Sequence, residues 1–200
     1  MAEDVATCAA GLNAALERSP LTVRLGAGNE GDIAEAKKVL PLSDSMIEWY
    51  RCAAPLEFEI PWTLEGLVLY GPGDLVDRQA GYRWISGVEE ELIEEWNAEW
   101  VVIGDCSADP VIADTSKPET PIFTAMHGCG SWEPELIAPN LGAYLQILSH
   151  WVDALTENEG RIEDEHGEFL SGFLDSLKAR LSGSTPDVCI DNLFGHLWTE

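Results

Sequence analysis

The chain has 200 residues, 46% of them hydrophobic and eight of them tryptophan, so it can build the core of a folded domain and is not an acidic disordered tail. Its 11 lysines and arginines against 36 aspartates and glutamates give a formal net charge of −25. This charge repels nucleic acid phosphates and anionic membrane surfaces, which argues against both as partners and favours a basic protein.

The amino-terminal stretch and the cysteines indicate the cellular compartment. Glu3, Asp4 and Asn13 lie in a stretch without a long apolar run, so neither a secretory signal nor a membrane span is predicted there. The five cysteines form no CxxC pair and no zinc-like spacing, and their odd number argues against a secreted disulfide framework. We therefore expect a cytoplasmic protein with reduced thiols.

Three helices are predicted near the start of the chain. The alanine and leucine content favours a helix over residues 5–17, and a second helix is favoured over 32–40, where a proline follows. Ser43 or Asp44 caps a third helix, over 43–54, which also ends at a proline.

A β-leaning region comes next. Residues 67–70 form a short apolar run bounded by Gly66 and by the turn sequence 71–73, Gly-Pro-Gly. This pattern predicts a strand followed by a loop and a short helix.

Residues 88–100 have an acidic helical pattern. Val88, Leu92 and Trp96 stand four apart on one face of the predicted helix, and glutamates occupy much of the rest. The glutamates form a solvated face, a docking surface for a basic partner, or both. The docking surface is suggested because such dense like charges raise the electrostatic cost of folding and need a reason to persist. The candidate partner-binding residues are Glu90, Glu91, Glu94 and Glu95.

Three short apolar segments, 101–105, 110–114 and 121–126, are separated by turn residues and predict consecutive antiparallel strands at the centre of a sheet. Pro139 is expected in the first turn of a long amphipathic helix that reaches Leu155 and lies across one face of this sheet. The predicted fold class is α+β, with helices packed around a twisted, mainly antiparallel β-sheet.

The last part of the chain has three segments. Residues 157–168 form an acidic linker, 169–181 an amphipathic helix, and 188–198 a short apolar piece. The apolar piece can pack internally or against a second copy, so the oligomeric state stays open.

A set of carboxylates with one imidazole suggests a metal site. Asp105, Asp109, Asp114 and His127 are residue types that bind a divalent cation, and they would support metal-assisted hydrolysis if they converged. Their spacing matches no metal, nucleotide or nucleophile motif. Each aspartate also fits an ordinary turn, where its side chain accepts hydrogen bonds from backbone amides.

The sequence HGCGSW, residues 127–132, permits a tight bend between strands, because Gly128 and Gly130 allow backbone angles that other residues avoid. His127 is either a hydrogen-bonded corner residue or a titratable site residue. Ser107 and His127 suggest a nucleophile and a base, but there is no nucleophile elbow or oxyanion element. We assign no catalytic residue, metal ion or cofactor.

The tryptophans near this bend have two interpretations. Trp96, Trp100 and Trp132 stand beside apolar neighbours, which favours a place in the core over a binding platform.

The run W-x3-W-x2-IGD-x3-DP-x-IAD, followed by TPIFTAMHGCGSW and IAPNLGAYLQIL, resembles the SMI1/KNR4 family, also called the SUKH superfamily. The resemblance spans about residues 30–155 and is most specific over 96–132. The chain differs from the family pattern at Cys106-Ser107-Ala108, where many members have a glycine-rich turn. The positions that carry the family signature are Trp100, Ile103, Gly104, Asp105, Asp109, Pro110, Asp114, His127, Gly128, Gly130 and Trp132.

The resemblance implies an α+β fold and a binding role, with the signature residues as scaffold or interface. Bacterial members are commonly immunity proteins that neutralise toxins of polymorphic toxin systems, often nucleases, and fungal relatives are regulatory proteins. We therefore expect a bacterial immunity protein that binds a basic toxin domain. The alternatives are a regulatory adaptor or a DNA mimic, and a metal-dependent hydrolase.

The resemblance also sets the expected domain organisation. Residues 1–28 are an N-terminal helical extension, and 29–156 are the family-like α+β domain. Residues 157–200 are the acidic linker and a C-terminal helical tail, packed on the same domain.

Overall fold

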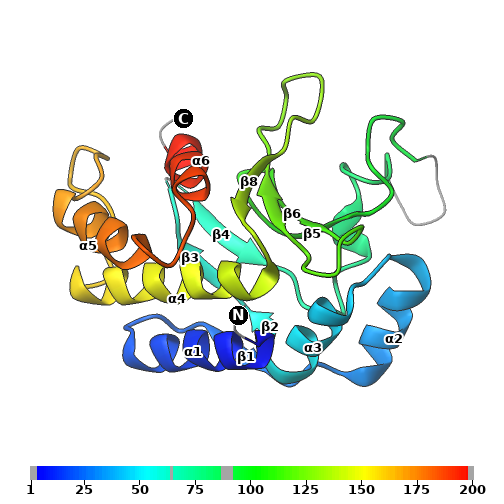
Figure 1. The fold of residues 1–200 in the computed structure, drawn as a ribbon, viewed down its shortest axis with the longest axis horizontal. Coiled ribbons are helices and arrows are strands. Elements are labelled where there is room, and N and C mark those ends of the chain that lie inside the picture. The colour runs from blue at the N-terminus through cyan, green and yellow to red at the C-terminus, as the bar shows by residue number, and fades with distance from the viewer. Residues whose placement is uncertain (1–3, 64, 87–91, 198–200) are drawn as a thin grey trace.

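The structure, a computed structural model, describes residues 4–63, 65–86 and 92–197 (Figure 1). These residues form six α-helices and two antiparallel sheets, which confirms the predicted α+β class. The helices are α1 (Val5–Arg18), α2 (Glu30–Val39), α3 (Asp44–Ala53), α4 (Leu141–Glu157), α5 (Ser171–Leu181) and α6 (Asp187–Leu197), with a 3-10 helix η1 (Asp77–Gln79). The strands are β1 (Arg24–Gly26), β2 (Ala54–Glu57), β3 (Glu59–Pro61), β4 (Gly66–Leu69), β5 (Trp100–Cys106), β6 (Asp109–Asp114), β7 (Ile122–Thr124) and β8 (Glu135–Ala138).

The larger sheet is a six-stranded meander in the order β3-β4-β5-β6-β7-β8, with each strand antiparallel to the one before it. The three predicted central strands are confirmed as β5, β6 and β7. Strands β5 and β6 carry runs of buried residues, as expected of strands that are covered on both faces. Strands β1 and β2 form a separate two-stranded sheet beside α1 and α3.

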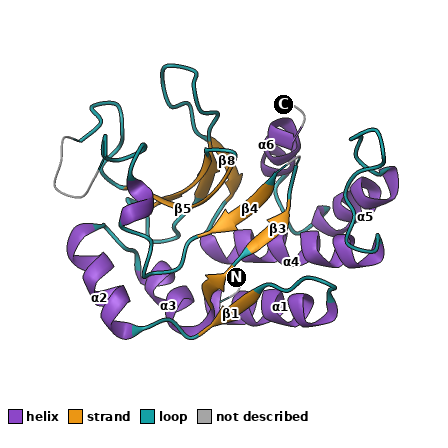
Figure 2. Ribbon diagram, turned by 180° about the vertical axis from the view of Figure 1, so that it is seen from behind, coloured by secondary structure: helices purple, strands orange, loops and turns teal. Residues whose placement is uncertain are grey.

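Helix α4 lies between the larger sheet and α1, and the two helices run side by side along the base of the molecule (Figures 1 and 2). The side chain of Trp151 on α4 reaches the edge of the sheet, where it stacks on Trp62 at 4.0 Å between ring centroids. Its Nε1–H donates a hydrogen bond to the Pro61 carbonyl at 2.8 Å. The core is therefore centred on α4.

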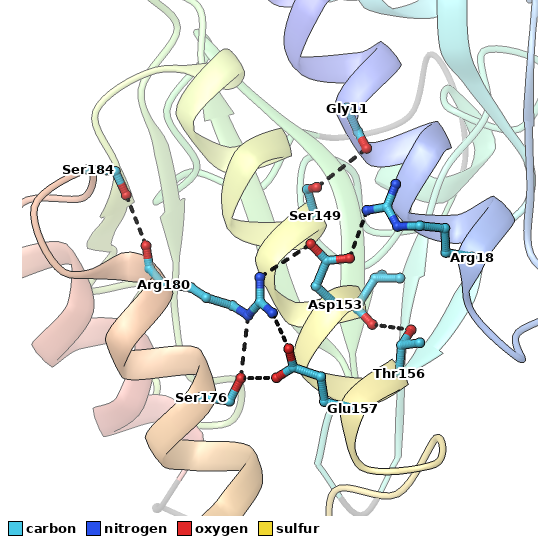
Figure 3. Close-up of polar contacts among 10 residues, drawn as sticks. Gly11, Arg18, Ser149, Asp153, Thr156, Glu157, Ser176, Arg180 and Ser184 are labelled. Atoms are coloured by element: carbon cyan, nitrogen blue, oxygen red, sulfur yellow. Dashed lines mark hydrogen bonds and ion pairs between the residues drawn. The ribbon is translucent and has the colours of Figure 1, made fainter.

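The carboxy-terminal helices pack on this core. Helix α5 is held on α4 by the T-shaped contact between the Phe173 and Trp151 rings, and by Arg180, which Figure 3 shows between the two helices. The Arg180 guanidinium contacts Glu157 and Asp153, and Arg18 of α1 donates to the same Asp153 carboxylate at 2.9 Å. This network joins α1, α4 and α5.

Helix α6 covers the sheet edge at β8. The Asn192 side-chain amide donates to the Leu136 carbonyl at 2.9 Å, and His196 Nε2 lies 3.3 Å from Glu135. The described part of the apolar 188–198 segment therefore packs within this chain, with Leu193, Phe194 and Leu197 buried.

The prediction of a helix over 88–100 is wrong for the residues that the structure describes, and 88–91 lie outside them. Residues 93–99 form turns, and Leu92 makes an isolated antiparallel bridge with Trp84. The Trp96 ring is buried among other aromatic rings, and its Nε1–H donates to the Trp100 carbonyl at 3.2 Å. These tertiary contacts override the helical spacing.

The expected position of Pro139 is also wrong. Residue Ala138 still belongs to β8, and Pro139 stands between that strand and the helix cap. The Asn140 side-chain oxygen accepts from the Ala143 backbone N–H at 2.8 Å, so α4 begins at Leu141.

The β5–β6 turn is strained. Ser107 and Ala108 have φ values of 51° and 72°, the left-handed region that favours glycine or asparagine.

We expect Ala108→Gly to raise the free energy of unfolding by about 0.5–1 kcal/mol, because relief of this strain exceeds the added entropy of the unfolded chain. Urea denaturation should measure the gain. Ala98→Gly, in an exposed turn without a positive φ, is the control, and equal effects of the two changes would contradict the prediction.

No helix within the described ranges is long and apolar enough to span a membrane. None of the five cysteines, all of which lie in these ranges, forms a disulfide.

Candidate functional site

Two of the signature residues have structural roles in the sheet. Gly104 on β5 faces β4 so closely that an added Cβ would stand 2.4 Å from the Val68 carbonyl oxygen, which restricts the position to glycine. Pro110 is buried opposite Asp105. Both residues act as scaffold.

The four candidate metal ligands do not converge. Asp105 stands opposite Pro110, and Asp109 stands opposite Cys106. Because opposed residues share a face and neighbours along a strand alternate, the two aspartate side chains project from opposite faces of the sheet. Asp114 accepts hydrogen bonds from the backbone and hydroxyl of Ser116 in the turn after β6. Within the described part of the chain, no three histidine, cysteine or acidic side chains form a metal-binding group.

Only Asp109 and His127 come together. One carboxylate oxygen of Asp109 accepts from the His127 backbone N–H and lies 2.7 Å from His127 Nδ1. Ser107 lies in the β5–β6 turn, and among the described contacts none joins it to His127. The pair therefore ties the start of the β7–β8 loop to the sheet, as a corner contact.

Asp105 is half-buried and accepts a hydrogen bond from the Tyr70 hydroxyl. Burial raises the pKa of Asp105 above its ordinary value of 3.8, while a hydrogen bond from the Ala108 backbone lowers it. The raised pKa means that the folded protein binds the Asp105 proton more tightly than the unfolded chain. Ionisation of Asp105 therefore costs folding free energy, and the cost grows as the pH rises from about 3.8 through the folded-state pKa.

Asp105→Asn should remove this cost. We expect the stability of the variant relative to the natural protein to rise between pH 4 and pH 7, because asparagine still accepts from Tyr70 and cannot ionise. Urea denaturation at a series of pH values checks this. A difference in unfolding free energy that is constant or falls over this range would contradict it.

The tryptophans form an aromatic cluster at one end of the sheet. The Trp96 ring makes T-shaped contacts with Trp100 and Trp132, each at 5.5 Å between centroids, and the Tyr82 ring centroid lies 5.7 Å from that of Trp132. Trp96 is buried, whereas Trp100 and Trp132 are partly exposed. The predicted core placement is correct for Trp96, and Trp132 reaches the surface.

The loop between β7 and β8, residues 125–134, projects from the molecule between α6 and the segment that precedes β5 (Figures 1 and 2). Gly128 and Gly130 in this loop have φ values of 75° and 82°, which confirms the bend that the glycines predict. A hollow lies on each side of the loop. We call the hollow next to α6 the α6 groove and the hollow next to Ile93 and Glu95 the tryptophan groove.

The α6 groove has a volume of about 520 Å³. It is lined by Met126, Cys129, Ser131, Glu133, Pro134, Glu135, Gly195 and His196. The tryptophan groove has about 290 Å³ and shares Met126, Cys129 and Ser131 with it. The two hollows therefore form one continuous surface around the loop.

Acidic and apolar side chains both line this surface. Met126 is 40% exposed, and Glu95 and Glu133 are exposed in the same hollows. Leu92, 57% exposed, and Glu94 stand next to the lining residues Ile93 and Glu95 in the chain. Glu90 and Glu91 lie outside the described residues. Exposed apolar side chains beside charged ones are a composition that protein-binding surfaces share.

Sequence reasoning missed the α6 groove, since Gly195 and His196 are some 60 residues beyond the loop that they face. No local pattern marks them, and only the docking of α6 on β8 brings them there.

Comparison with known proteins gives no relatives: no family model, no curated protein and no solved structure matches this chain.

Proposed function

We propose that this protein is a bacterial immunity protein, which acts in the cytoplasm by binding and neutralising a basic toxin domain. The resemblance of residues 96–132 to the SMI1/KNR4 family supports a binding role. The net charge of −25 supports a basic partner, because opposite charge accelerates association and suppresses wrong partners.

The observation that carries the proposal is that most of the cations on the surface are already engaged. Counting only contacts between residues that the structure describes, six of the eleven lysines and arginines form ion pairs with aspartate or glutamate, namely Arg18, Arg24, Lys38, Arg51, Arg161 and Arg180. Three more lie over aromatic rings, namely Arg78, Arg83 and Lys178. The carboxylates in excess are therefore available to an external cationic surface.

Two exposed regions concentrate these carboxylates. One surrounds the β7–β8 loop, with Glu94, Glu95 and Glu133. The other is the predicted acidic linker, whose residues 163–168 form a tight loop in which Asp164 accepts from the backbone N–H groups of His166 and Glu168. Only the first region also exposes large apolar side chains, so it is the better candidate for a stable interface.

Affinity capture tests the proposal. The tagged protein is incubated with lysate of its native cell at about 50 mM and 300 mM salt, and bound proteins are identified by mass spectrometry. We expect one basic protein that binds at low salt, is released by salt, and loses its toxic activity when mixed with this protein in equal amount. A non-toxic basic partner, such as a nucleic-acid-binding regulator, would contradict the immunity function and favour an adaptor or a DNA mimic.

A further inference from the structure

We propose that the α6 groove binds an arginine side chain of the partner protein, with the carboxylates of Glu133 and Glu135 as the ligands of its guanidinium group. This inference rests on the proposed function for the basic nature of the partner. It adds the location of the contact and the chemical group that is recognised.

The walls of the groove fit an aliphatic stem with a cationic head. Met126 and Pro134 supply apolar surface, and the backbone of Gly195 leaves open space, because no atom lies within 4 Å of the position that a Cβ would take there. Glu133 and Glu135 are exposed at the same hollow. Among the residues that the structure describes, the lining contains no lysine or arginine, and its acidic side chains are these two glutamates.

The second carboxylate has one anchored neighbour. His196 Nε2 lies 3.3 Å from the Glu135 carboxylate, and the packing of α6 on β8 holds the histidine, whose side chain is 13% exposed, whereas that of Glu135 is 54% exposed. The exposed carboxylate can accept two parallel N–H groups from a guanidinium. Arginine presents such a planar pair of donors, whereas lysine presents a single point charge.

His196 also lines a second, narrow cavity of about 30 Å³. Tyr144, which is fully buried, lines this cavity, and its hydroxyl has no hydrogen-bond partner among the described residues. Asp109 and Thr124 line the same cavity. Because an unsatisfied buried hydroxyl is costly, Tyr144 gives this otherwise mostly apolar cavity a hydrogen-bonding group next to His196.

Butylguanidinium, which reproduces the end of an arginine side chain, tests the site without the partner. We expect it to bind the full ¹⁵N-labelled chain at millimolar concentration, with saturable amide shifts at Met126, Cys129, Ser131, Glu135 and Gly195. The neutral analogue butylurea should bind about tenfold more weakly or not at all, since it lacks the charge. Equal binding of the two compounds, or shifts that do not saturate at these residues, would overturn the proposal.

Matched variants separate this site from the general charge of the protein. Glu133→Gln with Glu135→Gln should weaken butylguanidinium binding about tenfold, as two carboxylate contacts are lost. Glu163→Gln with Glu165→Gln removes the same charge from the acidic linker and should change the binding less than twofold. Gly195→Leu should block the groove while leaving α6 folded, since leucine favours helix and the space is open. Equal losses in the two double variants would show a nonspecific charge effect and overturn the proposal.

The two proposals fail in different ways. If butylguanidinium binds in the groove but capture yields no basic partner, the arginine site stands and the immunity function fails. If a toxin is neutralised equally well by the natural protein and by the Glu133→Gln, Glu135→Gln variant, the immunity function stands and the location of the contact fails.

Discussion

Trp151→Ala is expected to lower the free energy of unfolding by about 3–5 kcal/mol, the cost of removing a large aromatic side chain from a packed core. The ring is fully buried between Trp62 and Phe173, at 4.0 Å and 4.9 Å between centroids. It therefore fills the junction between the sheet edge, α4 and α5. Urea denaturation followed by circular dichroism measures the loss.

Trp151→Phe separates the ring from its polar group. Phenylalanine keeps aromatic contact with Trp62 and Phe173 but loses the hydrogen bond to the Pro61 carbonyl. We expect an intermediate loss of about 1–2 kcal/mol, from one missing hydrogen bond and a smaller ring. If both substitutions cost less than about 1 kcal/mol, a threshold set by the usual cost of surface changes, Trp151 is not central to the core.

Gln79→Met is expected to lower the free energy of unfolding by about 2–4 kcal/mol, because it leaves two backbone groups of Val102 without partners in the core. Gln79 is fully buried. Its side-chain oxygen accepts from the Val102 N–H at 2.9 Å, and its Nε2–H donates to the Val102 carbonyl at 2.8 Å. Methionine has a similar size and neither hydrogen-bonding group.

The reason for this large effect lies in the sheet. Strand β4 ends at Leu69, and Tyr70 makes the last backbone bond to β5, at the Ile103 carbonyl. At Val102 the Gln79 side-chain amide takes the place that a neighbouring strand would occupy. Arg78→Met, next to Gln79 on an exposed face, is the matched control and should cost no more than about 1 kcal/mol, the value of an exposed cation–π contact. A larger loss for Arg78→Met than for Gln79→Met would contradict this account.

The sequence predicted the elements whose pattern is local. The helix over 43–54 has both a cap and a regular apolar face, and the helix predicted from Pro139 to Leu155 has the apolar face, although it begins at Leu141. The strands over 101–105 and 110–114 are apolar runs with polar ends. The short strands β1, β2 and β3 were missed, because strands of three or four residues such as Arg24–Gly26 hold too few side chains to show a period.

The helix predicted over 88–100 shows how tertiary contacts override a local pattern. The spacing of Leu92 and Trp96 fits a helix, but Trp96 packs against Trp100 and Trp132 from β5 and the β7–β8 loop. Trp132 is distant in sequence, so the pattern of 88–100 alone contains no sign of that contact.

The candidate site was predicted only in part. The bend at Gly128 and Gly130 and the pairing of Asp109 with His127 lie within the signature region. The α6 groove depends on Gly195 and His196, which follow the acidic linker, and on the docking of α6 through Asn192. A contact between segments so far apart in the chain leaves no mark in either local pattern.

Coexpression with a toxin tests the immunity function most directly. The toxin would be the basic protein recovered by affinity capture or encoded beside the gene for this protein, expressed in a sensitive host with and without it. We expect growth to be restored only in its presence, and the purified toxin to lose its activity at an equimolar ratio through a salt-sensitive complex. Undiminished toxicity in cells that contain the folded protein in excess, with no complex formed at low salt, would contradict the immunity function.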